Sequence, residues 1–410
     1  MEYEKLTKLF YKKGEQFAEE EYKKRINSYG SYLTPLSVQG FRKGKLTQCH
    51  HSLFYVNIPY LMQLNNKVLK NSSRISSLIA KLPQYILEPY FHKMIVNEAQ
   101  SNNEIEGIRS TKKELESVLE GVNRSENLNK RFTGLMKTYL FIDDIEPFKT
   151  VRDFRELYDD LVSKEIESSN EPDGRLFRKG YVEVNNGLSI THIGVSTEDK
   201  IIECLNTLIT YLEDDEHPEL YRYMVAHYFY EYVHPFYDGN GRTGRLLVCS
   251  YLSRYLERYS AITFSYAVNK NKNKYYKALE GVPNPLNKGE LTFYLMDMLE
   301  LLSMGQEEII EDLEISLGKR ERIAKFFNED FVESSRDKWL ILKFMVDISV
   351  FVNNDANISI TKLMDAVNIT RYKVDKIVSE LESEGYIEQV SLRPKAFKVN
   401  EGFLENTLRV

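Results

Sequence analysis

The sequence predicts a mainly α-helical protein with one small β-hairpin between its helices. Three observations support this fold class. Apolar residues recur at helical spacing over most of the chain from residue 84 to residue 330. Alternation of apolar and polar residues is clearest over one stretch, 174–196. The composition, with 42% hydrophobic and 28% charged residues, is that of a globular protein of two or three domains.

The helices follow one another with few interruptions. We expect the first of the regular series from residue 84 to Gly107, because a glycine is a common residue just after a helix end. Thr111 followed by Glu114 has the spacing of a capping box that opens the next helix. The remaining helices are expected at 151–166, 198–213, 218–233, 242–258, 273–281 and over most of 290–330.

The segment 174–196 interrupts the helices. Its alternating side chains surround Asn185-Asn186-Gly187, and Asn-Gly is a strong signal for a tight hairpin turn. We therefore expect a β-hairpin here.

The last part of the chain, 337–410, has a different pattern. Three short helical segments precede a strand, a turn with Pro394 and a second strand, which is the order of a winged helix-turn-helix domain. The segment holds ten Lys and Arg against eleven Asp and Glu, so it is not basic overall. DNA binding would depend on a local cluster of basic side chains: Arg371, Lys373, Lys376, Arg393, Lys395 and Lys398. A docking or dimerising role remains an alternative.

The N-terminal sequence has no signal-peptide pattern, and no part of the sequence has a run of 18 apolar residues. The three cysteines, Cys49, Cys204 and Cys249, are far apart and form no metal-binding spacing. We expect a reduced, cytoplasmic protein with no membrane segment. The net charge of −6 argues against a chain built around nucleic-acid binding.

One short stretch, HPFYDGNGRTGR at 234–245, concentrates the chemistry of the chain. Its glycines match GxGxxG, a dinucleotide-binding pattern. That pattern should follow a buried strand. The preceding segment is long, aromatic and charged at Arg222 and Glu231, which favours a helix.

A phosphate site explains the stretch better. Gly239 and Gly241, on either side of Asn240, allow successive backbone N–H groups to converge on an anion. A helix that begins near Arg242 adds its N-terminal dipole. Arg242 and Arg245, three residues apart on this helix, can grip a polyphosphate.

Two further side chains supply reactive groups. Asp238 is placed to hold Mg²⁺ between phosphates, since this ion prefers one or two carboxylates together with phosphate oxygens. His234, four residues earlier, is close enough to take a proton from a hydroxyl that attacks a bound phosphate.

The stretch resembles the signature of the Fic family, HPFx(D/E)GNGRxxR, at every position. The resemblance implies a helical core over roughly 90–310, with the motif on a loop between two helices. It also implies transfer of AMP from ATP to a protein hydroxyl, with Mg²⁺, or Mn²⁺ as an alternative, and release of pyrophosphate. The hairpin at 174–196 would be the flap that aligns the target segment by strand addition, and a plain surface hairpin is the alternative.

The resemblance assigns roles by position. His234 is the implied general base and Asp238 the implied metal ligand, while Phe236 is expected to pack in the core and anchor the loop. The implied nucleotide- and phosphate-binding residues are Gly239, Asn240, Gly241, Arg242, Gly244, Arg245 and Tyr276. A glycine at 244 fits nucleotidyl transfer. Tyr276, with its neighbour Tyr275, has a core role as its alternative.

A second motif suggests a restraint on this activity. Many Fic proteins carry an inhibitory helix with the pattern (S/T)xxxE(G/N), and SNNEIEGI at 101–108 resembles it. Glu106, followed by Gly107, would pair with Arg245 and repel the γ-phosphate. Asn102 stands where the family has Ser or Thr, on the same helical face as Glu106.

The sequence therefore predicts an autoinhibited protein adenylyltransferase. Its expected segments are 1–83, an N-terminal extension packed on the rest; 84–310, a Fic core with the inhibitory helix at about 88–107; 311–336, a helical linker; and 337–410, the winged-helix-like domain. Expected partners are ATP and a protein target, with the chain itself as one candidate target and a homodimer as one candidate assembly. Alternatives are a nucleotide-sensing regulator that binds DNA through 337–410, removal of AMP with water positioned by Glu106, and transfer of UMP or phosphocholine from the same site.

Overall fold

The structure, a computed structural model, describes residues 3–124, 130–185, 187, 189–329, 335–352 and 357–409. It divides into two compact units. The first comprises Met1–Ser73 and Met94–Gln306, and the second comprises Arg74–Lys93 and Glu307–Val410. Three long helices, α3 (Pro59–Ile79), α4 (Gln84–Ile105) and α14 (Thr292–Glu329), contribute residues to both units. The domain boundaries expected from the sequence stay predictions.

The first unit is mainly helical, as the sequence predicts. The expected capping threonine is present, because the side chain of Thr111 accepts a hydrogen bond from the backbone N–H of Glu114. The other helices between the inhibitory segment and α14 are α5 (Lys112–Asn123), α6 (Thr133–Leu140), α7 (Val151–Leu161), α8 (Glu198–Leu212), α9 (Glu219–Val233), α10 (Asn240–Tyr255), α11 (Arg258–Ala261), α12 (Phe264–Lys270) and α13 (Lys272–Gly281), with short 3₁₀ turns η1 (Ile142–Asp144), η2 (Ser163–Glu165), η3 (Ser168–Asn170) and η4 (Pro285–Asn287).

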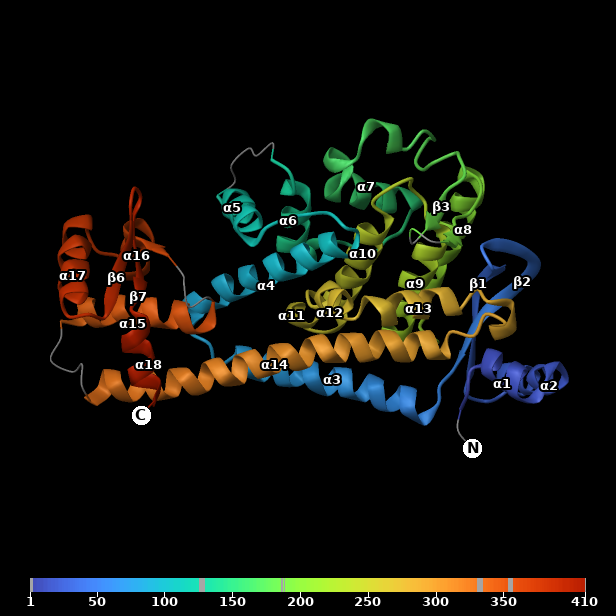
Figure 1. Ribbon diagram of the computed structural model, residues 1–410, viewed down its shortest axis with the longest axis horizontal. Helices are drawn as coiled ribbons and strands as arrows, with labels where there is room; N and C mark the ends of the chain where they lie inside the picture. Colours follow the sequence, from blue (N-terminus) through green and yellow to red (C-terminus); the bar gives the residue numbers. More distant parts are fainter. Residues whose placement is uncertain are drawn as a thin grey trace. The chain divides into compact units, whose positions relative to one another are not determined.

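Helix α9 lies at the centre of this unit. Eleven of its fifteen residues are buried, which is the pattern of a helix enclosed by others. It packs beside α8 and α10 (Figure 1). The segment that the sequence presented as a helix before the HPF motif is therefore the core of the fold, and the motif loop joins its end to the start of α10.

Two expected helix boundaries are corrected. The helix predicted to begin near Arg242 begins at Asn240, because Gly239 adopts the left-handed φ of 82° and becomes its N-cap. The helix predicted over 151–166 ends at Leu161, and the chain turns through η2 so that Glu165 points into the core.

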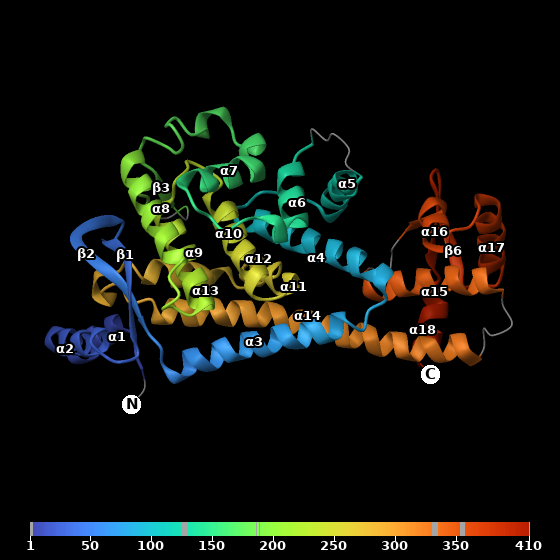
Figure 2. The same cartoon turned by 180° about the vertical axis from the view of Figure 1, so that it is seen from behind.

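The first residues form structure that the sequence reading did not resolve. Helices α1 (Leu6–Lys13) and α2 (Glu15–Ile26) precede a long antiparallel hairpin of β1 (Ser31–Arg42) and β2 (Lys45–Val56), seen from behind in Figure 2. Arg25 anchors this segment through an ion pair of 2.9 Å between its Nη1 and Oε2 of buried Glu290.

The predicted hairpin at 174–196 is present but shorter than expected. Strand β3 (Glu183–Asn185) pairs antiparallel with β4 (Ile190–Ile193), and residues 174–182 are not a strand. The reason lies in the side chains of those residues: Arg178 and its neighbours bond to the end of α9 and its loop instead of to a partner strand. Asn186 of the expected turn lies outside the described residues.

The second unit contains the expected order of three helices followed by two strands. Its sheet has the strand order β5-β7-β6. Strand β5 and helix α18 were not expected. The assignment of this unit as a winged helix stays a prediction. The elements are α15 (Arg336–Phe351), β5 (Ile358–Ser359), α16 (Ile360–Val367), α17 (Arg371–Ser383), β6 (Ile387–Leu392), β7 (Lys395–Val399) and α18 (Glu401–Arg409).

Among the described residues, every helix is too short or too polar to cross a membrane.

Candidate active site

The motif loop is held closed by its own side chains. The Asn240 amide donates from Nδ2 to the Phe236 carbonyl at 2.8 Å and accepts at Oδ1 from the Phe236 N–H at 2.9 Å. Phe236 is fully buried and stacks on Tyr158, as expected of an anchor. One N–H of the Asn240 amide and its oxygen therefore hold the loop closed, and the second N–H of the amide and the backbone N–H groups are the donors left for an anion here.

The start of α10 provides those N–H groups. The N–H of Thr243 is the first to bond within the helix, to the Gly239 carbonyl at 3.1 Å. The N–H groups of the preceding residues have no acceptor inside the helix, and the helix dipole favours negative charge beside them. Gly241 lies at this end, where a Cβ atom would collide with the Glu106 carboxylate. Glu106 therefore sits where an anion at the helix N-terminus would bind.

Arg245 is buried and held from one side by helix α4. Its Nε donates to Asn102 Oδ1 at 2.7 Å, and its Nη2 donates to the Asn102 carbonyl at 3.1 Å and to Glu106 Oε1 at 2.7 Å. Asn102 also donates to the Tyr139 hydroxyl at 3.0 Å. The nearby Glu106 charge raises the pKa of Arg245 against the effect of burial. The structure thus brings together the three residues that the inhibitory motif predicted.

Arg242 is not part of the contact between α4, Glu106 and Arg245. It is buried, and its Nη1 donates to Glu165 Oε2 at 2.8 Å. Burial raises the pKa of Glu165, and the Arg242 charge opposes that rise. In this structure Glu165, 77 positions earlier in the sequence, holds the first guanidinium in the core, apart from Arg245. That both arginines grip one polyphosphate stays a prediction. Gly244 likewise packs against Glu231 of α9 and not into the cavity.

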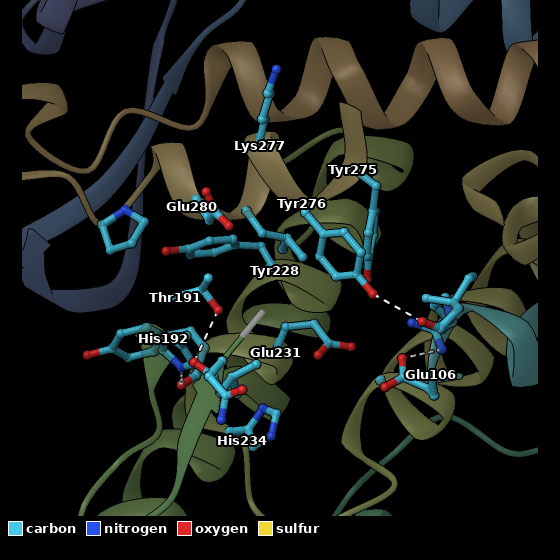
Figure 3. Close-up of a pocket in the computed structure, with 18 of the residues that line it drawn as sticks. Glu106, Thr191, His192, Tyr228, Glu231, His234, Tyr275, Tyr276, Lys277 and Glu280 are labelled. Atoms are coloured by element: carbon cyan, nitrogen blue, oxygen red, sulfur yellow. Dashed lines mark hydrogen bonds and ion pairs between the residues drawn. The ribbon is translucent and has the colours of Figure 1, made fainter. Parts of the chain in front are cut away.

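A cavity of about 620 Å³ lies beside the motif. Its lining includes His234, Glu106 and Tyr276, which Figure 3 labels. Gly241 and Arg245 also line it. The lining is completed by the last residue of α4 and by residues of the flap, of α9 and of the α13 region: Ile105, Val184, Asn185, Thr191, His192, Tyr228, Glu231, Tyr232, Asn273, Tyr275, Lys277, Leu279, Glu280 and Pro283.

His234 ends α9 in a left-handed conformation, with φ of 51° and ψ of 63°. Its imidazole lines the cavity, and a neutral imidazole keeps one ring nitrogen as an acceptor. Burial, with smaller contributions from His192 and Arg178, lowers the pKa of His234 to about 3. The ring is therefore neutral at physiological pH and able to accept a proton.

Tyr275 and Tyr276 have different environments. Tyr275 is buried and its hydroxyl is bonded to His227 Nε2 at 2.9 Å, which is a core role. Tyr276 is 40% exposed and donates to the Ile105 carbonyl at 3.3 Å, at the end of the helix that carries Glu106. Both tyrosines line the cavity, and Tyr276 is the more exposed of the two (Figure 3).

Asp238 lies on the exposed side of the loop. Its Oδ1 accepts the Gly239 N–H at 2.6 Å, and its second oxygen is left for another ligand. Within the described part of the chain, no three His, Cys, Asp or Glu side chains cluster closely enough to hold a metal by themselves. A single carboxylate fits Mg²⁺ that is held mainly by phosphate oxygens and water.

Sequence reasoning missed Glu231 as a site residue. It lines the cavity, its Oε1 has no hydrogen-bond partner, and burial raises its pKa to about 8 against the effect of the Arg245 charge. The signal was a carboxylate in an otherwise aromatic helix, three residues before His234. Glu165 and His192 were missed because neither has a local pattern.

The structure places a neutral histidine, a helix N-terminus and a buried arginine at one cavity of a helical core, and comparison with known proteins shows what this arrangement is similar to. Residues 147–252, which include the whole motif, match the sequence model described as the Fic/DOC family. The chain is also similar to a solved Fic family protein from Desulfovibrio desulfuricans G20, with 17% identity over 85% of this chain and 98% of that one and a TM-score of 0.52. The predicted resemblance to the Fic family and the mainly helical Fic-type fold are therefore confirmed.

Two other solved structures are less similar. One is Fic-1, residues 134–508, from C. elegans, with 17% identity over 63% of this chain and 75% of that one and a TM-score of 0.44. The other is a Fic domain containing signaling protein from Bacteroides thetaiotaomicron, with 20% identity over 62% of this chain and 96% of that one and a TM-score of 0.40.

Proposed function

We propose that this protein transfers AMP from Mg·ATP to a Ser, Thr or Tyr hydroxyl of a protein, and that Glu106 restrains the reaction. The family match supports the coarser function, since Fic domains transfer nucleotidyl or other groups onto proteins. The observation that carries the proposal is one cavity that combines neutral His234, the open N-terminus of α10 at Gly241, and Arg245.

The proposed chemistry assigns each group one task. The target hydroxyl oxygen forms a bond to the α-phosphorus, and the bond from that phosphorus to the bridging oxygen breaks, so its electrons leave with pyrophosphate. His234 takes the hydroxyl proton. Its low pKa makes it a weak base in the empty site, and the negative triphosphate would raise that pKa toward the working range. The helix N-terminus and Arg245 hold phosphate oxygens.

The metal has a limited part in this scheme. Asp238 would hold Mg²⁺ through its free carboxylate oxygen. When bound, the ion neutralises charge on the phosphate oxygens.

The proposed restraint follows from the position of Glu106. Its carboxylate is bonded to Arg245 and lies against Gly241, the two places where phosphate oxygens would bind. A γ-phosphate that approached Arg245 would meet this negative charge, so ATP would be held in a pose unsuited to transfer.

The alternative of a DNA-binding regulator is less well supported. Among the six expected contact residues of the second unit, Arg371 and Lys395 lie 3.7 and 3.1 Å from Asp375, Lys373 lies 3.9 Å from Asp337, and Lys398 lies 3.1 Å from Glu388. Charges already paired within the unit release few counterions on binding DNA. A sensor would also have no use for a neutral histidine at the phosphate site.

A donor comparison tests the proposed function. Wild type, Glu106→Gly and Glu106→Gly/His234→Ala are incubated separately with Mg²⁺ and ATP, UTP or CDP-choline, and release of pyrophosphate or CMP is followed. We expect turnover with ATP that is fast in Glu106→Gly, slow in wild type and lost in the double variant. Preference for another donor would replace AMP transfer by UMP or phosphocholine transfer. No turnover with any donor would remove the hypothesis of an enzyme that modifies its own chain.

A further inference from the structure

The end of helix α9 is capped by side chains of the flap segment. A helix leaves its last carbonyl groups without partners inside the helix. Here the Tyr232 carbonyl accepts a hydrogen bond of 2.7 Å from Nε2 of His192, and the Val233 carbonyl accepts one of 3.1 Å from the Val195 N–H. His192 stands on β4 opposite Val184 of β3. It is fixed to the same helix end that carries His234.

This hydrogen bond determines what the other side of the His192 ring offers. A carbonyl oxygen can only accept, so Nε2 carries the hydrogen and Nδ1 of the neutral ring is an acceptor. Burial, with a contribution from Arg178, lowers the pKa of His192 to about 4, so the ring is neutral at physiological pH. His192 lines the cavity, and its ring centroid is 6.1 Å from that of His234 (Figure 3).

The chemistry of the proposed substrates limits which group can bind this acceptor. The triphosphate offers only acceptors, and the one hydrogen of a target hydroxyl goes to His234. ATP has two other kinds of donor, the ribose hydroxyls and the amino group of adenine. The ribose is joined directly to the α-phosphate at which His234 would act, and the His192 ring lies beside that of His234, so the ribose hydroxyls are the nearer donors. The flap contributes the polar lining residues Asn185, Thr191 and His192 together with apolar Val184. The opposite set includes Leu279 and Pro283, which offer apolar surface suited to a base, together with polar Asn273, Lys277 and Glu280.

We propose that His192 is a ribose-binding residue whose Nδ1 accepts a hydrogen bond from a ribose hydroxyl of the nucleotide. The proposal rests on the proposed function, because it takes a nucleoside triphosphate as the ligand of this cavity. It adds a selection for ribonucleotides over deoxyribonucleotides, and it gives His192 two roles: a cap of α9 through Nε2 and a ligand contact through Nδ1.

The test uses binding, so that it does not depend on transfer. Glu106→Gly/His234→Ala protein is titrated calorimetrically with Mg²⁺ complexes of ATP, 2′-deoxy-ATP and 3′-deoxy-ATP. His192→Phe and His192→Gln are added to the same background. Gln is the matched control, since its Nε2 can donate to the Tyr232 carbonyl while its Oε1 accepts. Phe removes both functions.

We expect ATP to bind about tenfold more tightly than one of the two deoxynucleotides, the factor that corresponds to one net hydrogen bond. His192→Phe should abolish this ratio and His192→Gln should keep it. A purely structural role would weaken all three ligands equally and leave the ratio unchanged, which would overturn the proposal. Absence of any preference in the parent protein would overturn it too. Failure of AMP transfer with an intact ribose preference would count against the proposed function alone.

Discussion

Replacement of Glu106 gives the largest effect that the site geometry predicts. The carboxylate makes a charge-assisted hydrogen bond of 2.7 Å to Arg245, whose side chain is 1% exposed, while Glu106 itself is 33% exposed. A γ-phosphate that reached Arg245 with Glu106 in place would put two negative charges about 5 Å apart. At an effective dielectric constant of about 20, this repulsion is about 3 kcal/mol, or roughly two orders of magnitude in an equilibrium constant.

Part of this repulsion is relieved when the partly exposed side chain turns toward solvent. We therefore expect Glu106→Gly to raise the rate of nucleotide transfer by roughly ten- to a hundredfold, and Glu106→Gln, which keeps the volume but not the charge, by somewhat less. The assay is single-turnover transfer at saturating Mg·ATP.

Glu104→Gly is the matched control for this experiment. Glu104 is exposed in the last turn of α4, which ends one residue before Glu106, and its Oε2 accepts from Asn269 Nδ2 at 2.7 Å, away from Arg245. The control separates loss of the Arg245 contact from loosening of the helix end. Equal activation by Glu104→Gly, or no activation by Glu106→Gly, would refute the reasoning.

Three further predictions follow from buried or loop residues. Glu165→Ala should lower the free energy of unfolding in urea by about 3–5 kcal/mol, since it leaves buried Arg242 without its partner, and Arg242→Met/Glu165→Leu should recover most of that loss; a change below 1 kcal/mol would show that the pair is not buried in solution. Burial lowers the pKa of His227 and His234 to about 3 and of His192 to about 4. As the pH drops below about 6.5, these histidines are protonated in the unfolded chain before they are protonated in the folded one, so the melting temperature should fall, and less steeply in His227→Gln. A flat profile from pH 7 to 5 would contradict these shifts. Asp238→Asn should raise the Mg²⁺ concentration for half-maximal transfer several-fold and change the rate at saturating Mg²⁺ less; an unchanged Mg²⁺ requirement would remove Asp238 as the metal ligand.

The sequence predicted those parts of the protein whose signals are local. Helices α8 and α9 lie within a residue of their expected bounds, because apolar residues at helical spacing define each of them within one short window. The geometry of the motif loop was accessible for the same reason, since its glycines and the helix start are adjacent. The pairing of Glu106 with Arg245 was predicted only through the resemblance to a family motif.

What the sequence could not predict depends on contacts between distant segments. Arg242 looked like a second phosphate ligand, and only the fold shows that Glu165 binds it in the core. His192 had no pattern of its own, and its position beside His234 comes from the packing of a short hairpin on the end of α9. The β1–β2 hairpin was missed because Pro35 and Gly40 interrupt a pattern in which alternate residues of β1 are buried.

The measurement that tests the central proposal most directly is the mass of the intact protein after incubation with Mg·ATP. Wild type, Glu106→Gly and Glu106→Gly/His234→Ala are compared, each alone and with a cell extract as a source of targets. The extract is first depleted of nucleotides, and labelled ATP then reports which of its proteins are modified. The account predicts covalent AMP on the chain or on a target that is strong in Glu106→Gly, weak in wild type and absent without His234. Modification that persists in the His234→Ala variant, or its absence from Glu106→Gly under both conditions, would contradict it.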